Sequence, residues 1–384
     1  MSDDKSKINR VRLICEFIKL TSFDSESFNE EKISEYLKEK LKELGLKVES
    51  DTASEILKKI STGTSHPASN IYATLKGNKA GLPVLFSAHM DTVKPGTGKR
   101  ALLHQDGKIT SKDDTVLGAD DVSGLVSIIE ALTVIKENGL STPDLEIVFT
   151  AAEEPYCTGS RFLAYDRLKA KEGYVLDLTG PVGKAALAAP SILSVSIKVN
   201  GRSAHAGFAP EQGINALSIA AGALAKIKTG RIDEDLTLNF GTIIGGSGKN
   251  IVPESVEIEG EIRSMDHRKA TEAADKIRTE FEKAASEYGG SVEVTVTEQI
   301  HSYRVSKERN VVKRFIKAAG ETERCIKPEC IDTFGGSDAN RLNEHGIETI
   351  VLACAMENCH STKEYTSVEE LEKSAELTLK LMTL

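Results

Sequence analysis

The sequence of 384 residues is poor in aromatic side chains and has no excess of positive charge. It contains no tryptophan, and aromatic residues make up 5% of it. Lysine and arginine number 49 against 58 aspartates and glutamates, a formal net charge of −9. Because the binding of nucleic-acid phosphates needs a cationic surface, and no basic cluster with interleaved aromatic residues is present, we expect no nucleic-acid partner.

Long apolar runs are also missing. Segments such as Pro83–Phe86 have the length of a strand, and none approaches the ~20 residues that a membrane-spanning helix needs. The first ten residues are polar and contain no apolar segment of the kind found in secretory signals. We therefore expect a cytoplasmic protein without a membrane partner.

Cysteine is scarce and scattered. The six cysteines form no Cys-x-x-Cys pair, which favours reduced thiols in a cytosolic protein; they are Cys15, Cys157, Cys325, Cys330, Cys354 and Cys359. A structural zinc site built on Cys325 and Cys330 is the weaker alternative, because no second pair accompanies them.

The chain is longer than one hydrophobic core usually organises, so two domains are expected. Helical spacing of apolar residues predicts helices over 30–44 and 119–137, and short apolar runs predict strands over 83–88, 145–150 and 174–178. Strands that alternate with helices indicate a mostly parallel sheet covered by helices on both faces.

The pattern changes near residue 190. Strands over 192–199, 236–244, 256–263 and 291–297 show apolar and polar residues in alternation or near-alternation, with helices expected at about 211–228 and 267–287. The order β-α-β-β-α-β is that of a ferredoxin-like α+β domain, whose sheet has one buried and one more exposed face.

After about residue 303 the α/β pattern returns, with a helix over 311–320, a buried strand over 348–355 and a C-terminal helix over 367–382. We therefore predict one α/β domain formed by residues 1–189 and 302–384. A smaller domain of residues 190–301 is inserted into it.

Acidic residues and histidines follow the predicted strands of the larger domain. His89 and Asp91 come directly after the strand 83–88, where open α/β sheets place their sites. By itself a His-x-Asp pair is more often a solvated turn. Asp120 and Asp121 open the helix 119–137, which suits a helix N-cap and equally a carboxylate that bridges two metal ions.

Three further positions extend the pattern. Glu153 and Glu154 follow the strand 145–150, Asp177 lies inside an apolar strand, and His360 follows the strand 348–355. A solvated pair of glutamates is the plain alternative for Glu153 and Glu154. A carboxylate within an apolar strand needs a partner, because burying an unpaired charge is costly.

His66 and His104 lie in hydrophilic loops, and His301 and His345 have no acidic motif around them, so we expect structural or surface roles for these four. His267 begins a predicted helix, so capping or solvation is expected there. The clustered residues supply two imidazoles and several carboxylates without cysteine. This ligand set suits zinc or a similar divalent ion, and carboxylate bridging favours a pair of ions. The residues alone thus indicate a metal-dependent hydrolase.

Five motifs in order resemble the M20 metallopeptidases, specifically their peptidase T-like branch: HMDTV (89–93), GADDVSG (118–124), AAEE (151–154), Asp177 in YVLDL, and His360. The resemblance covers nearly the whole chain. It implies an α/β zinc-peptidase-like catalytic domain with an inserted ferredoxin-like lid. It also implies an exopeptidase that acts on short peptides with two Zn²⁺ per subunit, Co²⁺ or Mn²⁺ being alternatives, and a homodimer through the lid.

The resemblance also assigns roles. His89, Asp120 and Asp177 would bind one zinc, and Asp120, Glu154 and His360 the other. Asp91 would orient the His89 ring, Glu153 would be the general base, and the peptide bond after Asp120 is expected to be cis.

For the lid, the resemblance implies that His205, Asn250 and Arg263 bind the substrate, with His205 hydrogen-bonding the substrate carbonyl oxygen. A solvated strand end is the alternative for Arg263. The loop 335–338 (GGSD) resembles a family loop that faces the cleft. Phe334 departs from the family pattern, because peptidase T tends to carry arginine there, and this weakens the expectation of strict tripeptide specificity.

Three functions remain open at this level. The first is an aminopeptidase of di- and tripeptides, and the second is an M20-type N-acyl amino acid deacylase. The third is a non-catalytic binding protein on the same fold, against which the intact Glu153 and the full ligand set argue.

Overall fold

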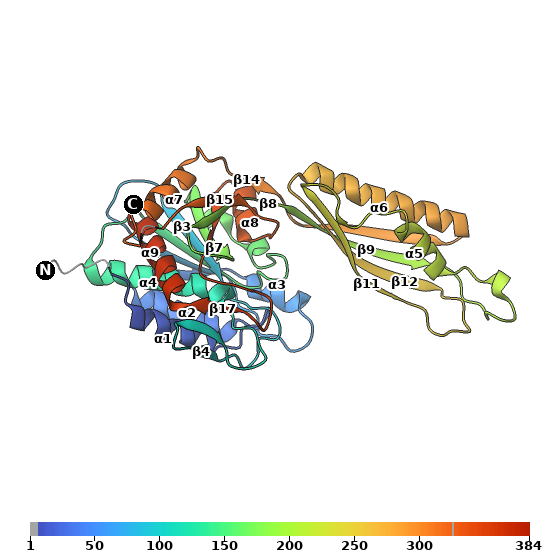
Figure 1. The fold of residues 1–384 in the computed structure, drawn as a ribbon, viewed down its shortest axis with the longest axis horizontal. Coiled ribbons are helices and arrows are strands. Elements are labelled where there is room, and N and C mark those ends of the chain that lie inside the picture. The colour runs from blue at the N-terminus through green and yellow to red at the C-terminus, as the bar shows by residue number, and fades with distance from the viewer. Residues whose placement is uncertain (1–6, 325) are drawn as a thin grey trace. The chain divides into compact units, whose positions relative to one another are not determined.

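The computed structural model describes residues 7–324 and 326–384, so Cys325 lies outside the described residues. The chain divides into two compact units (Figure 1). The larger unit comprises the chain up to Ala188 together with residues 304–333 and 337–384, and the inserted unit comprises residues 189–303 with 334–336. Among the described helices, none is both long enough and apolar enough to cross a membrane.

The larger unit is built on a nine-stranded sheet of order β1-β2-β6-β3-β7-β16-β8-β14, with β15 paired to β8. The central pairs β6-β3, β3-β7 and β7-β16 are parallel, and the outer pairs β1-β2 and β2-β6 are antiparallel. The mostly parallel central sheet expected from the sequence is thus confirmed. Its strands are β1 (Lys47–Ser50), β2 (Ile71–Leu75), β3 (Val84–His89), β6 (Leu145–Thr150), β7 (Glu172–Leu178), β8 (Lys184–Ala189), β14 (Tyr303–Arg304), β15 (Glu329–Asp332) and β16 (Glu348–Ala353).

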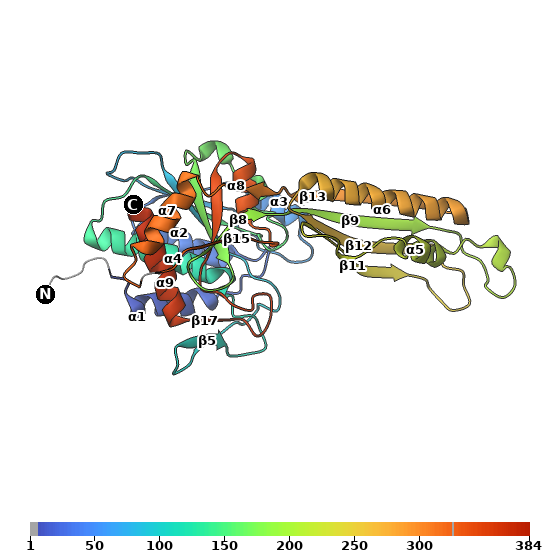
Figure 2. The ribbon, with the colours of Figure 1, turned by 45° about the horizontal axis from the view of Figure 1, so that its top comes forward.

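Helix α4 (Ala119–Asn138) is the central helix of this unit. It is buried along nearly its whole length, because α1 and α9 pack against it on the side away from β3 and β7 (Figures 1 and 2). Gly118 and Gly139 flank it with φ of 78° and 60°, left-handed conformations that glycine adopts without steric cost.

The other helices and short strands of the larger unit complete its layers. They are α1 (Arg10–Thr21), α2 (Glu31–Glu43), α3 (Ala53–Ile60), α7 (Asn310–Gly320), α8 (Asp338–Glu344), α9 (Val368–Thr383), and a three-stranded sheet of β4 (Ala101–Leu103), β5 (Lys108–Ser111) and β17 (Tyr365–Ser367).

The inserted unit has an antiparallel sheet of order β10-β11-β12-β9-β13. Helices α5 and α6 contact each other and the sheet, so they cover the same face. The order of the four long strands is the ferredoxin-like order predicted from the sequence. The elements are β9 (Ser191–Asn200), α5 (Ala216–Leu224), β10 (Gly230–Arg231), β11 (Leu236–Gly245), β12 (Ser255–Ser264), α6 (His267–Tyr288) and β13 (Ser291–Ile300).

One local prediction in this unit was wrong, and of the two roles expected for His267, capping is not observed. The helix expected at about 211–228 is only α5, because a 3₁₀ turn over Pro210–Gln212 precedes it and Asn215 caps its start with its side chain. His267 does not cap α6. Asp266 does, accepting a hydrogen bond from the Arg268 N–H.

Candidate metal centre

The strand ends of the larger unit bring the predicted site residues together. Strand β3 ends at His89, and the loop after β6 carries Glu153 and Glu154. Strand β7 contains Asp177, and His360 lies in the loop after β16. Because β3, β6, β7 and β16 run parallel, their carboxyl ends meet at one edge of the sheet.

Asp120 stands at the centre of this group. Its Oδ1 atom is 3.0 Å from His89 Nε2, and its Oδ2 atom is 3.2 Å from His360 Nε2. Asp177 lies on the His89 side, 3.9 Å away, and Glu154 on the His360 side, 3.0 Å away. The two carboxylate oxygens of Asp120 therefore face two separate groups of donor atoms.

The peptide bond between Asp120 and Asp121 is cis, as the resemblance predicts. Several residues of the loops after β6 and β16 have positive φ, among them Ala152 (47°), Cys157 (53°) and His360 (60°). Such conformations are sparsely populated for residues other than glycine and persist where the surrounding structure imposes them.

The His89 ring is held by its own loop. Its Nδ1 atom lies 2.9 Å from the backbone carbonyl oxygen of Asp91 and 3.5 Å from the Asp91 carboxylate. Donation from Nδ1–H to the carbonyl directs Nε2 at the group around Asp120, where a protonated ring donates to the carboxylate and a neutral ring would offer its lone pair to a metal ion.

The Asp91 carboxylate makes its main contacts elsewhere. Its Oδ1 accepts the N–H of Glu153 at 2.9 Å, and its Oδ2 accepts the N–H of Glu154 at 3.2 Å and the Ser27 hydroxyl at 2.7 Å. Asp91 is fully buried, so these three bonds provide the polar partners that water cannot. Asp91 thereby joins the loop after β3 to the loop after β6.

Glu153 is buried beside other acidic groups. The Cys157 thiol donates to its Oε1 at 3.2 Å, and Glu153, Cys157 and Asp338 form a close group. Burial, only partly opposed by His89, raises the pKa of Glu153 well above its usual value, and the negative charge of Asp338 adds to the rise. A carboxyl group tuned upward is suited to exchange protons near neutral pH.

Burial and charge pairing shift the other groups in opposite directions. Burial alone would raise the pKa of Asp120, but hydrogen bonds from His360 and His89 hold it below its usual value. The same bonds to Asp120 and Glu154 raise the pKa of His360 to about 10. Burial raises the pKa of Asp177 well above its usual range and also raises that of Glu154.

Sequence reasoning missed Glu364. This buried glutamate accepts the N–H of Gly118 at 2.7 Å and that of Asp120 at 2.9 Å, so it supports the backbone from which Asp120 projects. Burial raises its pKa to about 7. Glu364 stands in an ordinary polar segment, 244 residues after Asp120, and no spacing or motif points to it.

Asp121 also supports the backbone around the donor group. Its carboxylate accepts the N–H of His89 at 3.1 Å and that of Gly124 at 3.0 Å. It thus connects the end of β3 to the first turn of α4, while its neighbour Asp120 faces the donor group.

The donor set fits divalent metal ions. It contains two imidazoles and several carboxylates, and its ligand atoms come together in two overlapping groups: His89, Glu153 and Asp177; and His89, Asp120 and Glu154. The buried Oε1 atom of Glu154 has no hydrogen-bond partner. A cation beside it would compensate the desolvation of this oxygen and of the surrounding carboxylates.

The three predicted substrate-binding residues lie in the inserted unit. His205 and Asn250 belong to two loops joined by backbone hydrogen bonds, from Ala206 N–H to Asn250 O at 3.0 Å and from Val252 N–H to Ala204 O at 2.9 Å. Arg263 lies near the end of β12, where it bonds Glu261 through Nε at 2.6 Å and the Phe334 carbonyl through Nη1 at 3.0 Å.

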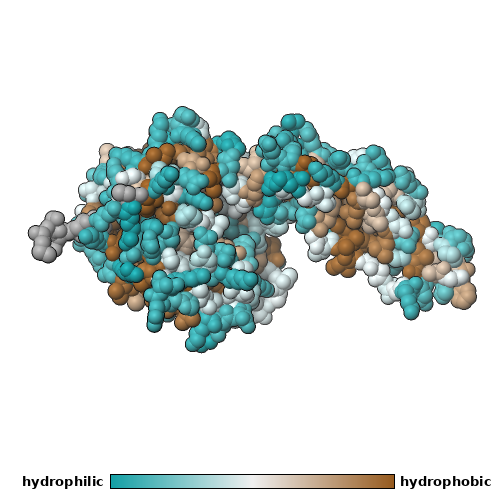
Figure 3. Space-filling model, viewed as in Figure 1, coloured by the Kyte–Doolittle hydropathy of each residue, from teal (hydrophilic) through white to brown (hydrophobic). Residues whose placement is uncertain are grey.

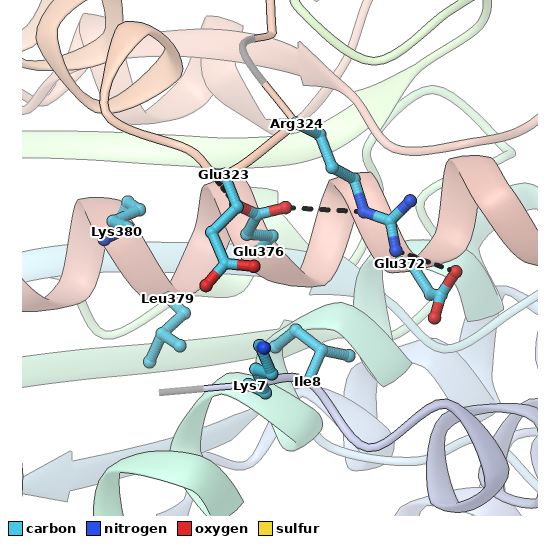
Figure 4. Close-up of a pocket in the computed structure, with 8 residues that line it drawn as sticks. All are labelled: Lys7, Ile8, Glu323, Arg324, Glu372, Glu376, Leu379 and Lys380. Carbon is cyan, nitrogen blue, oxygen red and sulfur yellow. Dashed lines mark hydrogen bonds and ion pairs between the residues drawn. The ribbon is translucent and has the colours of Figure 1, made fainter. Parts of the chain in front are cut away.

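A separate pocket of about 210 Å³ in the larger unit shares no residue with this centre (Figure 4). Arg324 lies in it and pairs with Glu372 at 3.0 Å and with Glu376 at 3.5 Å, both on α9. These ion pairs give Arg324 a structural role, because they tie it to α9.

Two family models match the chain. One is described as a peptidase dimerisation domain and matches residues 187–289, and the other is described as peptidase family M28 and matches residues 70–226. Among curated proteins, the uncharacterized protein YqjE of Bacillus subtilis is 37% identical over 98% of both chains. Peptidase T of Listeria innocua is 28% identical over 85% of this chain and 80% of that protein.

Solved structures of two peptidases are similar to this chain over nearly its whole length. The aminopeptidase PepT from Bacillus cereus superimposes with a TM-score of 0.88 at 38% identity, and a tripeptidase from Staphylococcus aureus with a TM-score of 0.92 at 34% identity. Each comparison covers 98% of this chain and 98% of the other.

Proposed function

The chain belongs to the M20 metallopeptidases, in their peptidase T-like branch, and on this basis we propose that it is a two-zinc aminopeptidase of di- and tripeptides. Membership makes it a metal-dependent exopeptidase. The number and identity of the metal ions, the catalytic roles and the substrate length are the proposal.

The position of Asp120 is the observation that supports a pair of metal ions. Its two oxygens contact His89 Nε2 at 3.0 Å and His360 Nε2 at 3.2 Å, and no other carboxylate of the centre contacts both rings at such distances in the described residues. We assign His89, Asp120 and Asp177 to one ion and Asp120, Glu154 and His360 to the other. Imidazole and carboxylate ligands suit zinc, with Co²⁺ or Mn²⁺ as substitutes.

When bound, the two ions supply Lewis-acid activation of water and of the peptide carbonyl. Glu153 then takes a proton from the attacking water and passes it to the departing amine. Because the backbone N–H groups of Glu153 and Glu154 are both held by Asp91, the base and its neighbouring ligand keep a fixed relation to His89.

His205 is assigned to the substrate carbonyl oxygen. Its Nδ1 accepts the backbone N–H groups of Gly207 at 3.1 Å and Phe208 at 3.2 Å. A neutral ring therefore carries its proton on Nε2, so Nε2–H is the donor that can stabilise a developing oxyanion. Asn250, on the adjoining loop, is assigned to substrate binding.

Arg263 is assigned to the terminal carboxylate of the peptide, by a bidentate contact. Glu261 already engages its guanidinium at two donors, Nε at 2.6 Å and Nη2 at 3.2 Å. Binding of a peptide carboxylate would therefore compete with Glu261.

A homodimer through the inserted unit is part of the proposal. Strand β10 pairs with β11 at Leu238 and Thr237, and the Ile232 N–H bonds the Leu236 carbonyl at 2.9 Å. Within the described residues, the stretch 239–245 of β11 has no strand paired with it on that side. Ile243 and Ile244 on it are 52% and 71% exposed, and apolar residues (brown) appear on the surface of this unit in Figure 3. An open apolar edge strand is a template for pairing with a second chain.

The base assignment is tested with Glu153→Gln, which keeps shape and removes the proton acceptor. We expect kcat to fall by about 10²–10⁴ with bound metal unchanged. Glu55→Gln, at an exposed position of α3, is the matched control and should behave as the unchanged protein. Undiminished hydrolysis by Glu153→Gln would remove Glu153 from the mechanism.

The substrate class is tested with zinc-loaded protein on a panel of dipeptides, tripeptides and N-acetyl amino acids. Release of the amino-terminal residue from short peptides, without hydrolysis of the acetyl compounds, is the expected result. The reverse pattern would favour the deacylase, and inactivity on the whole panel would favour the binding protein.

A further inference from the structure

Within the inserted unit, a histidine at the start of α6 meets a glutamate and a histidine at the end of β13. His267 is the first residue of α6, Glu298 lies near the end of β13, and His301 directly follows that strand. The two imidazole rings stack with centroids 4.1 Å apart and an angle of 28° between their planes. Helix α6 and strand β13 pack side by side (Figure 2), which brings the start of one to the end of the other.

The donor atoms of these three side chains converge. One ligand atom from each lies within 4.8 Å of the other two. The Glu298 carboxylate contacts both rings, with Oε1 2.8 Å from His301 Nδ1 and Oε2 3.9 Å from His267 Nε2. Ligands of a tetrahedral zinc with bonds of 2.0–2.2 Å are separated by roughly 3.3 Å, so only small side-chain rotations are needed.

The His267 ring is also held from behind. Its Nδ1 atom is 3.0 Å from the Ser191 hydroxyl, which itself accepts the N–H of Ser302 at 2.8 Å. Donation from Nδ1–H to Ser191 leaves Nε2 as a lone-pair donor facing Glu298. Metal-binding histidines are commonly fixed in this way through their second nitrogen.

We propose that His267, Glu298 and His301 form a second, separate divalent-metal site in the inserted unit, selective for zinc-like ions. Two imidazoles and one carboxylate are a ligand set used by zinc, and nitrogen donors disfavour Mg²⁺ and Ca²⁺. The side chains are between 29% and 44% exposed, so the fourth position is open to water.

An ion held here would link two pieces of chain. It would join the start of α6 to the segment from Glu298 to His301, shortly before the chain re-enters the larger unit at Arg304. Its effect is therefore to restrain the segment 298–303, and this site is distinct from the catalytic ligands.

The test compares zinc stoichiometries. The full chain is stripped with a chelator and titrated with Zn²⁺ against a zinc indicator, in parallel with His301→Ala, Glu298→Gln and His104→Ala. His104 is an exposed histidine of the larger unit and serves as the control. The unchanged protein and His104→Ala should bind one equivalent more than either variant of the site, whatever the catalytic centre takes up.

Hydrogen exchange gives a second measurement. Zinc should slow exchange in residues 298–303 of the unchanged protein and of His104→Ala, and leave it unchanged in His301→Ala and Glu298→Gln. Equal end points in all four proteins, or a loss in His104→Ala as large as in the site variants, would overturn the proposal. So would exchange in 298–303 that does not respond to zinc.

Discussion

The buried carboxylate of Asp91 accepts a hydrogen bond of 2.9 Å from the backbone N–H of Glu153. A second bond, from the N–H of Glu154 at 3.2 Å, reaches the other oxygen. Asp91, two positions after His89, therefore determines where the proposed base Glu153 and the proposed ligand Glu154 lie. This relationship between two loops of the sheet edge leads to the first prediction.

Asp91→Asn should lower kcat by about 10- to 100-fold, a size typical of residues that hold metal ligands from behind. The asparagine side chain would have an NH₂ group where one carboxylate oxygen now accepts hydrogen bonds. Because this NH₂ group would face an N–H or O–H donor, the loop of Glu153 and Glu154 should shift. Steady-state kinetics and zinc analysis measure the effect, with the exposed Asp166→Asn as control. Equal kcat values for both variants would show that the bonds to Asp91 are dispensable.

The second prediction concerns metal stoichiometry. Asp120→Ala should lose two equivalents of zinc relative to the unchanged protein, because each of its oxygens faces a different ligand group. Glu154→Ala should lose one, because its short contact within the centre is to His360 Nε2, at 3.0 Å, and it is proposed as a ligand of the ion on the His360 side alone. Elemental analysis after dialysis against a weak chelator distinguishes the two. Identical losses in both variants would contradict the bridging role of Asp120.

Metal binding should release protons. In the metal-free protein, hydrogen bonds to Asp120 and Glu154 raise the pKa of His360 to about 10. Burial lowers the pKa of His89, but hydrogen bonds to Asp120 and Asp91 outweigh it and raise the pKa well above its usual value. Both rings are thus charged near neutral pH, whereas a metal binds the neutral ring. Apparent affinity should therefore rise with pH, about tenfold per pH unit for each proton displaced.

Calorimetric titrations with Zn²⁺ in buffers of different ionisation enthalpy count these protons. The His104→Ala variant should release the same number as the unchanged protein, because His104 lies in a separate polar loop. A heat of binding that is independent of the buffer would refute the prediction.

Glu30 should make the metal-free protein less stable as pH rises. Burial, and then the charge of Asp91, raise its pKa from 4.5 to about 8. The folded state thus holds the Glu30 proton more tightly than the unfolded state. The contribution of Glu30 to the free energy of unfolding is complete below the pKa of Glu30 in the unfolded state. It is lost as pH rises through the pKa of Glu30 in the folded state.

Glu30→Gln should flatten this pH dependence between about pH 5 and 8, measured by denaturant unfolding of the metal-free protein. It should also lower stability at acid pH, because the carboxyl group accepts three backbone N–H groups, those of Phe28, Ala68 and Ala152. The neighbouring, exposed Glu31→Gln is the matched control. An unaltered pH slope in Glu30→Gln would assign the dependence to other groups.

The elements that sequence reasoning predicted well are those whose pattern is repeated along the chain. Helix α4 and the strands β3, β6 and β7 were found within a few residues of their predicted bounds, because continuous apolar runs are buried wherever they occur. Helix α5 was predicted too long, since apolar periodicity continued past a start that Asn215 sets by capping. Strand β1 has only four residues and no strong alternation, and it was not predicted.

The sequence by itself determined which ligand types are available and that they follow strands, because strand ends and motifs are local properties. Only the tertiary structure decided that Asp120 faces His89 with one oxygen and His360 with the other. It also decided that Asp91 holds the backbone of Glu153, and that Glu364 supports Asp120 from 244 residues away. Contacts between distant segments depend on how strands pair and helices pack, which no local spacing records. Hence the types of donor could be predicted, whereas the partner of each donor atom could not.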